Sequence, residues 1–337
     1  AVFEQRMAAL EGGIGAISTA SGQAALHLSI ATLMGAGGHI VASTALYGGS
    51  HNLLHYTLSR FGIETTFVSP GDIDAWRAAI RPNTRLLFGE TVGNPGLDVL
   101  DIPTLSQLAR EAQLPLLVDA TLTTPYLMQP LALGADLVYH SATKFLGGHD
   151  MVFTEESTVG AFLLRARREG LRDFGACMSP HTAWLLLQGI ETLPLRMERH
   201  LSNTEKVVAF LASHPMVARV GHPLIDTHPS HALAQKLFKH GAKGAGSVFS
   251  FDLRGSRAQG RSFIEALQIF SHLANVGDSR SLVIHPASTT HFRMSDEALQ
   301  NAGIGPGTIR LSIGLEDPDD LIEDLKRALK AAGKGAA

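Results

Sequence analysis

The sequence contains almost no cysteine, few aromatic residues and no long apolar run. Cys177 is the only cysteine among 337 residues, so no internal disulfide can form, and this favours a reducing compartment. The segment around it, DFGACMSP, favours a packed thiol over a nucleophile. No apolar run approaches the roughly 20 residues that span a bilayer, and the chain does not open with a signal-peptide pattern. We therefore expect a cytoplasmic protein without a membrane partner.

An excess of charge of either sign is also lacking. The 28 basic and 31 acidic residues give a net charge of −3, and the lysines and arginines do not cluster. Nucleic acid is therefore not an expected partner. The composition, 45% hydrophobic and 18% charged, is that of a folded globular protein, and the length predicts about two domains.

From about residue 14 to 150, short β-rich runs alternate with helical stretches. This rhythm predicts an α/β domain with a mostly parallel sheet that is covered by helices. The expected helices include 23–34, 73–79 and 103–112. The expected strands are 15–19, 39–43, 64–68, 84–89, 114–119 and 137–140.

The pattern changes after Cys177. Two long helices are expected at 179–200 and 203–214, the second capped by Ser202 or Asn203. Strands at 247–252 and 308–312 and helices at 260–267 and 319–332 follow. The prediction is a large domain over residues 1–190 and a smaller C-terminal α/β domain over 191–337.

A lysine follows one of the expected strands together with two hydroxyl residues. In ADLVYHSATKFLGG the strand ends at His140, and Ser141, Thr143 and Lys144 come after it. Ligands of open α/β sheets bind beyond the carboxyl ends of the strands. An amine at this place can form a Schiff base with a carbonyl cofactor, while the hydroxyls bind its phosphate. Taken alone, the motif more often marks a solvated surface lysine.

Two further segments favour a ligand-binding role for this lysine. In LPLLVDAT, Asp119 ends an apolar strand, where a buried carboxylate needs a cationic partner such as a protonated pyridine nitrogen. In TASGQAALHL, Ser21, Gly22 and Gln23 open a helix, where the N–H groups and the helix dipole attract a phosphate. For each segment alone, a capped turn or an ordinary N-cap would be a sufficient explanation.

Three more side chains could meet a ligand at the sheet edge or beside it. Tyr47, in LYGGS, can place its ring over a flat cofactor. Asn94, which follows Glu90 in ETVGNP, can bind the cofactor or the substrate, or can be an ordinary turn residue. Arg310, in the strand of TIRLS, needs a carboxylate, which an amino-acid substrate or a structural Asp or Glu would supply.

Together, SGQAA, LYGGS, ETVGNP, VDAT, HSATKFLGGH, HPASTTH and RLSIGLED resemble the Cys/Met-metabolism family of pyridoxal 5'-phosphate enzymes. The resemblance runs over most of the chain. It implies the PLP-dependent transferase fold type I, which is aspartate-aminotransferase-like. It also implies a homotetramer that is a dimer of catalytic dimers.

The resemblance implies roles for the residues that match the motifs. Lys144 would be the Schiff-base lysine that also moves protons, and Tyr47 would stack on the cofactor ring. Asp119 would pair with the ring nitrogen. Arg310 would bind the α-carboxylate of a small amino-acid substrate, with Asn94 close to it. The implied phosphate contacts are Ser21, Gly22, Gln23, Ser141 and Thr143.

Within the family, ANVGDSRSLVIHPASTTH resembles the O-acetylhomoserine sulfhydrylase branch, with Asn275, Val276 and Arg280 as the markers. Asn275 is therefore expected at the substrate. The implied reaction is γ-replacement of O-acetyl-L-homoserine by sulfide or methanethiol in methionine biosynthesis. A cystathionine γ-synthase, an O-succinylhomoserine sulfhydrylase and a methionine or cystathionine γ-lyase would use the same core residues.

Two departures from the family pattern concern missing segments. The upstream Tyr-x-Arg phosphate clamp has no counterpart, and the stretch GGHDMVFTEES near Asp150 is shorter than the family carries, so we expect residues to be absent at both places.

Two further classes of protein compete with this prediction. The pair His51 and His55, at i and i+4, could serve a metal-dependent hydrolase, but no Glu follows His51 as the zincin motif requires, and we expect no metal. A catalytically inactive binding protein that keeps the fold is the second competing class.

Overall fold

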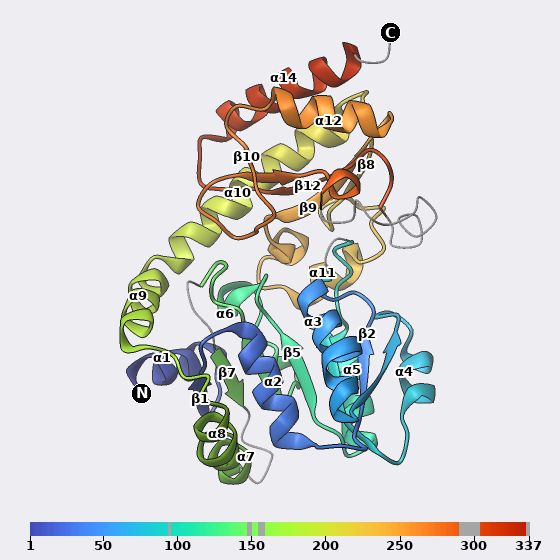
Figure 1. Cartoon of the computed structure of the whole chain (residues 1–337). Helices are drawn as coiled ribbons and strands as arrows, with labels where there is room; N and C mark the ends of the chain where they lie inside the picture. Colours follow the sequence, from blue (N-terminus) through green and yellow to red (C-terminus); the bar gives the residue numbers. More distant parts are fainter. Residues whose placement is uncertain (94–95, 147–149, 154–158, 290–303, 335–337) are drawn as a thin grey trace. The chain divides into compact units, whose positions relative to one another are not determined.

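The computed structural model describes the chain except residues 94–95, 147–149, 154–158, 290–303 and 335–337 (Figure 1). The contacts divide it into two compact units. The first unit comprises Ala1–Asn94 and Asp98–Leu193, and the second comprises Pro95–Leu97 and Pro194–Ala337.

The first unit contains a seven-stranded sheet in the order β1-β7-β6-β5-β4-β2-β3. β7 runs antiparallel to both of its neighbours, and every other described pair is parallel. Six of the seven strands therefore point the same way. Their bounds are β1 Gly15–Ser18, β2 His39–Ser43, β3 Glu64–Val68, β4 Thr84–Glu90, β5 Leu116–Asp119, β6 Leu137–His140 and β7 Asp150–Phe153.

Helices pack on this sheet and bury its apolar residues. α2 contacts β4, β6 and β7 and lies across the sheet (Figure 1). Side-chain caps fix several starts: Ser21 accepts from Ala24 N–H, and Asp101 accepts from Thr104 N–H. The helices are α1 Val2–Glu11, α2 Gly22–Leu33, α3 Gly48–Asn52, α4 Ile73–Ala79, α5 Ile102–Glu111, α6 Thr124–Leu127, α7 Val159–Arg165, α8 Arg172–Phe174 and α9 Pro180–Glu191. Shorter or irregular helical turns are η1 Leu53–Thr57, η2 Leu58–Phe61, η3 Leu131–Leu133 and η4 Ala166–Leu171.

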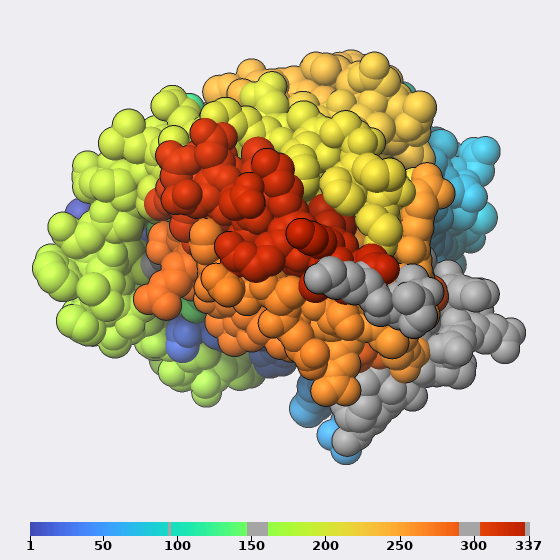
Figure 2. All heavy atoms as spheres, turned by 90° about the horizontal axis from the view of Figure 1, so that it is seen from above, coloured from blue at the N-terminus to red at the C-terminus, as the bar shows by residue number. Residues whose placement is uncertain are grey.

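The second unit contains a five-stranded sheet in the order β10-β11-β12-β9-β8, antiparallel except for the β10–β11 pair. α12 and α14 lie side by side on the surface of this unit (Figure 2). The strands are β8 Val217–Gly221, β9 Val248–Leu253, β10 Ser271–His272, β11 Leu282–Ile284 and β12 Thr308–Ser312. The helices are α10 Leu193–Ser213, α11 His231–Leu237, η5 Gly241–Ala245, α12 Arg257–Ala266, η6 Pro286–Ser288 and α14 Pro318–Lys334.

The expected strands and helices of the parallel sheet are confirmed, several to the residue, but the helical region after Cys177 differs. The break falls at Thr192 and not near 201, so the predicted helices 179–200 and 203–214 were wrong in extent. Asn203 is not a cap: it lies inside α10, where its amide donates to the carbonyls of Gly314 and Glu316. Cys177 is exposed, so the expectation of a packed thiol was also wrong.

Candidate active site

The ends of the parallel strands bring the residues singled out in the first unit to one edge of the sheet. β4 ends at Glu90, β5 at Asp119 and β6 at His140, and these three strands are neighbours in parallel register. β1 ends at Ser18, just before the Ser21 turn, and points the same way. The carboxyl ends of the strands thus carry the candidate groups on consecutive loops, as is typical of ligand sites in open α/β sheets.

The start of α2 lies directly against the loop after β6. A Cβ added at Gly22 would stand 2.7 Å from the Cβ of Ser141 and 3.0 Å from its Cα, so only glycine fits at this contact. The N–H groups of the first helical turn have no partner within a helix and favour an anion. Two segments more than a hundred residues apart in the chain therefore form one cradle that suits a phosphate.

The loop after β6 holds its hydroxyl groups in a fixed arrangement. Ser141 N–H donates to Thr121 Oγ1 at 2.8 Å, which ties this loop to the one after β5. The hydroxyls of Ser141 and Thr143 lie 3.3 Å apart, and Lys144 N–H donates to the Ser141 carbonyl at 3.3 Å. Lys144 is half-buried. Lys144 and the two hydroxyl residues thus lie on the loop that meets the start of α2.

Asp119 is a buried carboxylate with donors around it. Its Oδ1 accepts the Thr121 N–H at 2.8 Å, and its side chain also shares hydrogen bonds with the hydroxyls of Thr121 and Tyr139. Burial raises the pKa of Asp119, and the hydrogen bonds from Thr121 and Tyr139 oppose that rise. Such a carboxylate suits a cationic partner, as a protonated ring nitrogen would be.

Glu90 is the second buried carboxyl of the edge and lies beside Asp119. Burial and then the negative charge of Asp119 raise the pKa of Glu90 well above its ordinary value. Asp119 accepts from several donors, whereas the Glu90 carboxylate is stabilised by the backbone N–H of Tyr47. The surroundings of the pair therefore favour a proton on Glu90 over a proton on Asp119.

Tyr47 lies in the turn between β2 and α3. Its N–H donates to Glu90 Oε1 at 2.6 Å, so the turn is tied to the end of β4. The ring is 54% exposed, and a Cβ at Gly49 would overlap it. Glycine at this position lets an aromatic face remain accessible beside the sheet edge.

Arg310 and Asn275 come together in the second unit. Arg310 lies in β12 between β11 and β9, opposite Ile284 and Ser250, and is half-buried. Its Nη2 lies 3.5 Å from the Asn275 carbonyl. The third residue predicted for the substrate, Asn94, lies outside the described residues, as does most of the segment predicted to be short near Asp150.

Reasoning from the sequence missed Thr121 and Tyr139, which bind Asp119, and Ser50, which lies beside Tyr139. Tyr139 stands opposite Asp119 in the strand register, and its hydroxyl lies 3.4 Å from Ser50 Oγ. Tyr139 could have been found from the sequence, because it directly precedes the HSATK motif and, like Asp119, lies near the end of an expected strand. Thr121 and Ser50 gave no such signal.

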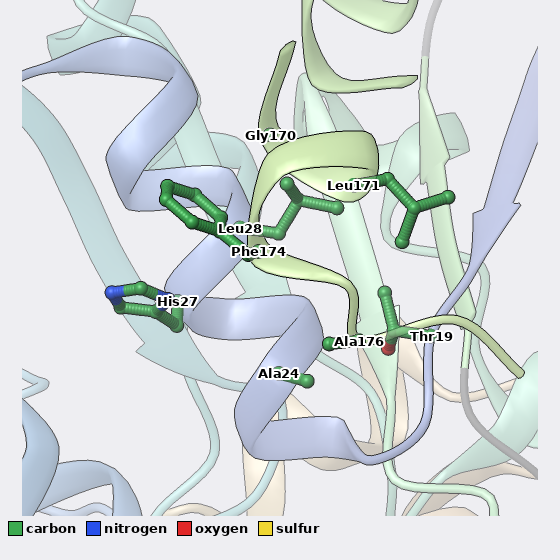
Figure 3. Close-up of a pocket in the computed structure, with 8 residues that line it drawn as sticks. All are labelled: Thr19, Ala24, His27, Leu28, Gly170, Leu171, Phe174 and Ala176. Atoms are coloured by element: carbon green, nitrogen blue, oxygen red, sulfur yellow. The ribbon is translucent and has the colours of Figure 1, made fainter. Parts of the chain in front are cut away.

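A small cavity of about 30 Å³ lies where α2 packs against η4 and α8 (Figure 3). It is too small for the cofactor, and the tilted contact of the His27 and Phe174 rings, with centroids 5.3 Å apart, borders it. It belongs to the packing of this helical layer. Its lining residues are Thr19, Ala24, His27, Leu28, Gly170, Leu171, Phe174 and Ala176.

The histidine pair considered as a metal site packs against an aromatic ring. The ring of His51 stacks on Phe67 with centroids 4.6 Å apart and lies 5.5 Å from the His55 ring. Within the described part of the chain, no group of three His, Cys, Asp or Glu side chains is placed to hold a metal ion. Over the same residues, no helix combines the length and apolarity that a bilayer crossing requires.

A parallel sheet whose edge carries a lysine, a helix start that suits a phosphate and a buried aspartate fits the class of pyridoxal 5'-phosphate enzymes. The comparison with protein families agrees: the model of the Cys/Met metabolism PLP-dependent enzymes matches residues 1–330. The chain belongs to this family, and it is therefore an enzyme that uses pyridoxal 5'-phosphate.

Similar proteins include sulfhydrylases and lyases. An O-acetyl-L-homoserine sulfhydrylase of Leptospira meyeri is 44% identical over 98% of this chain and 83% of its own length. An L-methionine gamma-lyase of Pseudomonas putida is 41% identical over the same shares, 98% and 83%. A crystal structure described as a putative O-acetylhomoserine (thiol)-lyase of Campylobacter jejuni has a TM-score of 0.93 and 37% identity, covering 98% of this chain and 86% of that one. That structure contains N'-pyridoxyl-lysine-5'-monophosphate.

Proposed function

We propose that the protein converts O-acetyl-L-homoserine and sulfide or methanethiol into L-homocysteine or L-methionine and acetate. The observation that carries the proposal is the contact of Gly22 with Ser141, which joins a phosphate cradle to the loop of Lys144. The choice of substrate is supported by the sulfhydrylases among the relatives, which include a second one from Corynebacterium glutamicum at 41% identity.

The proposed phosphate contacts surround this cradle. Ser21, Gly22 and Gln23 offer the first turn of α2, and Ser141 and Thr143 offer hydroxyls from the facing loop. The absence of a side chain at Gly22 lets the backbone approach an anion closely. We expect this set to bind the phosphate through neutral donors and the helix dipole.

The reacting end of the proposed site depends on three residues. Pyridoxal 5'-phosphate, when bound, supplies an electron sink for a carbanion at the α-carbon of an amino acid. Lys144 is the proposed attachment residue, and its Nζ moves protons during turnover. The Asp119 carboxylate would hold a proton on the ring nitrogen, and the Tyr47 ring would stack on the cofactor.

The substrate carboxylate is assigned to Arg310. A guanidinium binds a carboxylate through two parallel hydrogen bonds, and the Asn275 carbonyl beside it limits its orientation. Asn275 and Asn94 are proposed as further substrate contacts, and Asn94 as a cofactor contact, on the strength of their motifs.

The central experiment is Lys144→Ala, with Lys236→Ala, an exposed lysine of α11, as the matched control. Lys144→Ala is expected to lose the yellow colour of the lysine-bound cofactor and at least about a thousandfold of kcat in a sulfhydrylation assay. Lys236→Ala is expected to match the unmodified protein. Persistent colour with full turnover in Lys144→Ala would refute the proposed role of this lysine.

A substrate panel separates the members of the family. We expect release of acetate from O-acetyl-L-homoserine only when sulfide or methanethiol is present. Rapid formation of ammonia and a 2-oxo acid from L-methionine or cystathionine would favour a γ-lyase. Preference for O-succinyl-L-homoserine would favour an O-succinylhomoserine sulfhydrylase, and preference for cysteine as acceptor would favour a cystathionine γ-synthase.

The remaining proposals concern domains, assembly and location. We propose that the two units are the large cofactor-binding domain and the smaller C-terminal domain, and that the protein works in the cytoplasm on a small amino acid. A homotetramer is supported by apolar side chains that are exposed in the single chain, among them Trp184 (55%), Leu185 (49%) and Leu195 (69%). Light scattering of the cofactor-loaded protein tests the assembly.

A further inference from the structure

Three polar side chains form one row on the three central strands of the first sheet, near their carboxyl ends. Glu90 of β4 stands opposite Asp119 of β5, and Asp119 stands opposite Tyr139 of β6. Side chains in the same register of parallel neighbouring strands point to the same face of a sheet. All three are buried, with exposed fractions of 7%, 8% and 1%. A buried row of this kind requires internal hydrogen bonds, since water cannot satisfy it.

Both ends of the row are fastened to the segment that carries Tyr47. At one end, Glu90 Oε1 accepts the Tyr47 N–H at 2.6 Å. At the opposite end, the Tyr139 hydroxyl lies 3.4 Å from Oγ of Ser50, which belongs to α3 and is fully buried. Asp119 stands between them and shares a hydrogen bond with Tyr139. The row is thus joined to the Tyr47 segment at both of its ends.

The charge states of the row follow from these contacts. Burial and then the charge of Asp119 raise the pKa of Tyr139 well above its ordinary value of 10, so the phenol keeps its proton and donates it to Asp119. Burial and then the charge of Asp119 raise the pKa of Glu90 as well, which favours its neutral form. These surroundings favour the negative charge on Asp119, which is the carboxylate proposed for the cofactor nitrogen.

We propose that Glu90 and Tyr139 are positioning residues for the cofactor: they fix the Asp119 carboxylate and the Tyr47 turn to the ends of three adjacent strands. The inference rests on the proposed function, because it presupposes that Asp119 and Tyr47 meet the cofactor. Neither Glu90 nor Tyr139 needs to touch the cofactor itself. Each sets the place of a residue that does.

Tyr139→Phe tests one end, because it removes only the hydroxyl and keeps the ring that packs 6.2 Å from Phe88. The dissociation constant of the holoenzyme for pyridoxal 5'-phosphate is expected to rise about tenfold or more. This is the effect expected when a hydrogen bond to a charged group is lost. The circular dichroism of the cofactor's visible band is expected to shrink, because ring and carboxylate lose their fixed relation. Tyr56→Phe, an exposed hydroxyl, is the matched control.

Glu90 is tested by two variants with opposite expectations. Glu90→Gln keeps an oxygen that accepts the Tyr47 N–H, so its dissociation constant is expected within about threefold of the unmodified protein. Glu90→Leu removes the acceptor, and a rise of about tenfold or more is expected. Glu111→Leu, an exposed carboxylate on α5, is the control. This rescue by the amide distinguishes positioning from a general loss of packing, and melting temperatures verify that each variant is folded.

The outcomes separate the two levels of the proposal. If the unmodified protein binds no cofactor, or if Lys144→Ala keeps colour and turnover, the proposed function fails. If the unmodified protein binds the cofactor while Tyr139→Phe and Glu90→Leu match it in dissociation constant and visible dichroism, only the positioning inference is overturned. Should Tyr139→Phe fail to fold, Ser50→Ala removes the second partner of the Tyr139 hydroxyl. An unchanged dissociation constant in Ser50→Ala would also overturn the positioning inference.

Discussion

Gly22 is the position at which the phosphate cradle can be perturbed without removing a polar group. Replacement by alanine adds one methyl group, which would stand 2.7 Å from the Ser141 Cβ and 3.1 Å from its Oγ. Neither neighbour is the flexible end of a long side chain, because Ser141 Cα is also only 3.0 Å away. The backbone of one segment must therefore move.

The size of that movement follows from ordinary contact distances. Carbon atoms in contact lie about 3.5–4.0 Å apart, so the start of α2 and the Ser141 loop must separate by roughly 1 Å. Overpacking of this kind costs about 1–3 kcal/mol of folding free energy. A displacement of about 1 Å between groups that must bind one phosphate is expected to weaken cofactor binding about a hundredfold.

The assay is titration of the cofactor-free protein with pyridoxal 5'-phosphate, followed by visible absorbance and by melting temperature. Gly35→Ala, beyond the C-terminal end of the same helix, is the control, because a Cβ there meets no atom within 4 Å. It is expected to change stability by less than about 0.5 kcal/mol and to leave the dissociation constant unchanged. A Gly22→Ala protein that binds the cofactor within about threefold of the unmodified protein would refute the cradle.

Three further outcomes follow from the described contacts. Asp119→Asn removes the charge but keeps an acceptor for Thr121 N–H; kcat is expected to fall at least about a hundredfold, with a smaller change in cofactor affinity. Because the pKa of Glu90 is raised above its ordinary value of 4.5, Glu90 contributes stability that is lost as pH rises from 4.5 towards its folded pKa, and Glu90→Gln lacks this contribution. The free energies of unfolding from urea titrations should therefore diverge by up to about 1.4 kcal/mol per pH unit in that window, and parallel curves would contradict the assignment. Asn203→Ala leaves two carbonyls in the second unit without their amide donor, and we expect a loss of about 2–4 kcal/mol in urea unfolding with cofactor affinity retained.

Much of the first sheet could be predicted because its strands are short β-rich runs bounded by turn residues. The strands 39–43, 64–68 and 137–140 match the structure to the residue. The position of Lys144 could be predicted for the same reason, since it follows a strand whose end is marked by polar residues. Local sequence therefore determines where each strand stops and which side chains follow it.

The register between strands could not be predicted in this way. Whether Asp119 stands opposite Tyr139 or one residue away depends on how whole strands align, and nothing within either strand specifies it. The contact of Gly22 with Ser141 likewise depends on the crossing of α2 over the sheet. The side chains that surround Asp119 were missed because their positions depend on the tertiary structure.

The helix break after Cys177 shows a tertiary contact overriding a local signal. Ser202 and Asn203 favour a helix start, because their side chains compete for backbone donors. In the structure, the Asn203 amide donates instead to Gly314 and Glu316, about 110 positions further along the chain. Once those carbonyls supply the partner, the residue has no reason to cap, and α10 continues through it.

The buried carboxylate of Asp119 links stability and ligand binding in the first unit. Burial disfavours the Asp119 carboxylate, and the donors around it offset only part of that effect, since its pKa remains raised. A cationic ring nitrogen beside Asp119 would add the missing opposite charge in a place with little water. The burial that makes Asp119 costly to ionise therefore makes it selective for a partner that brings a proton. The raised pKa of Glu90 disfavours a second negative charge that would compete for that proton.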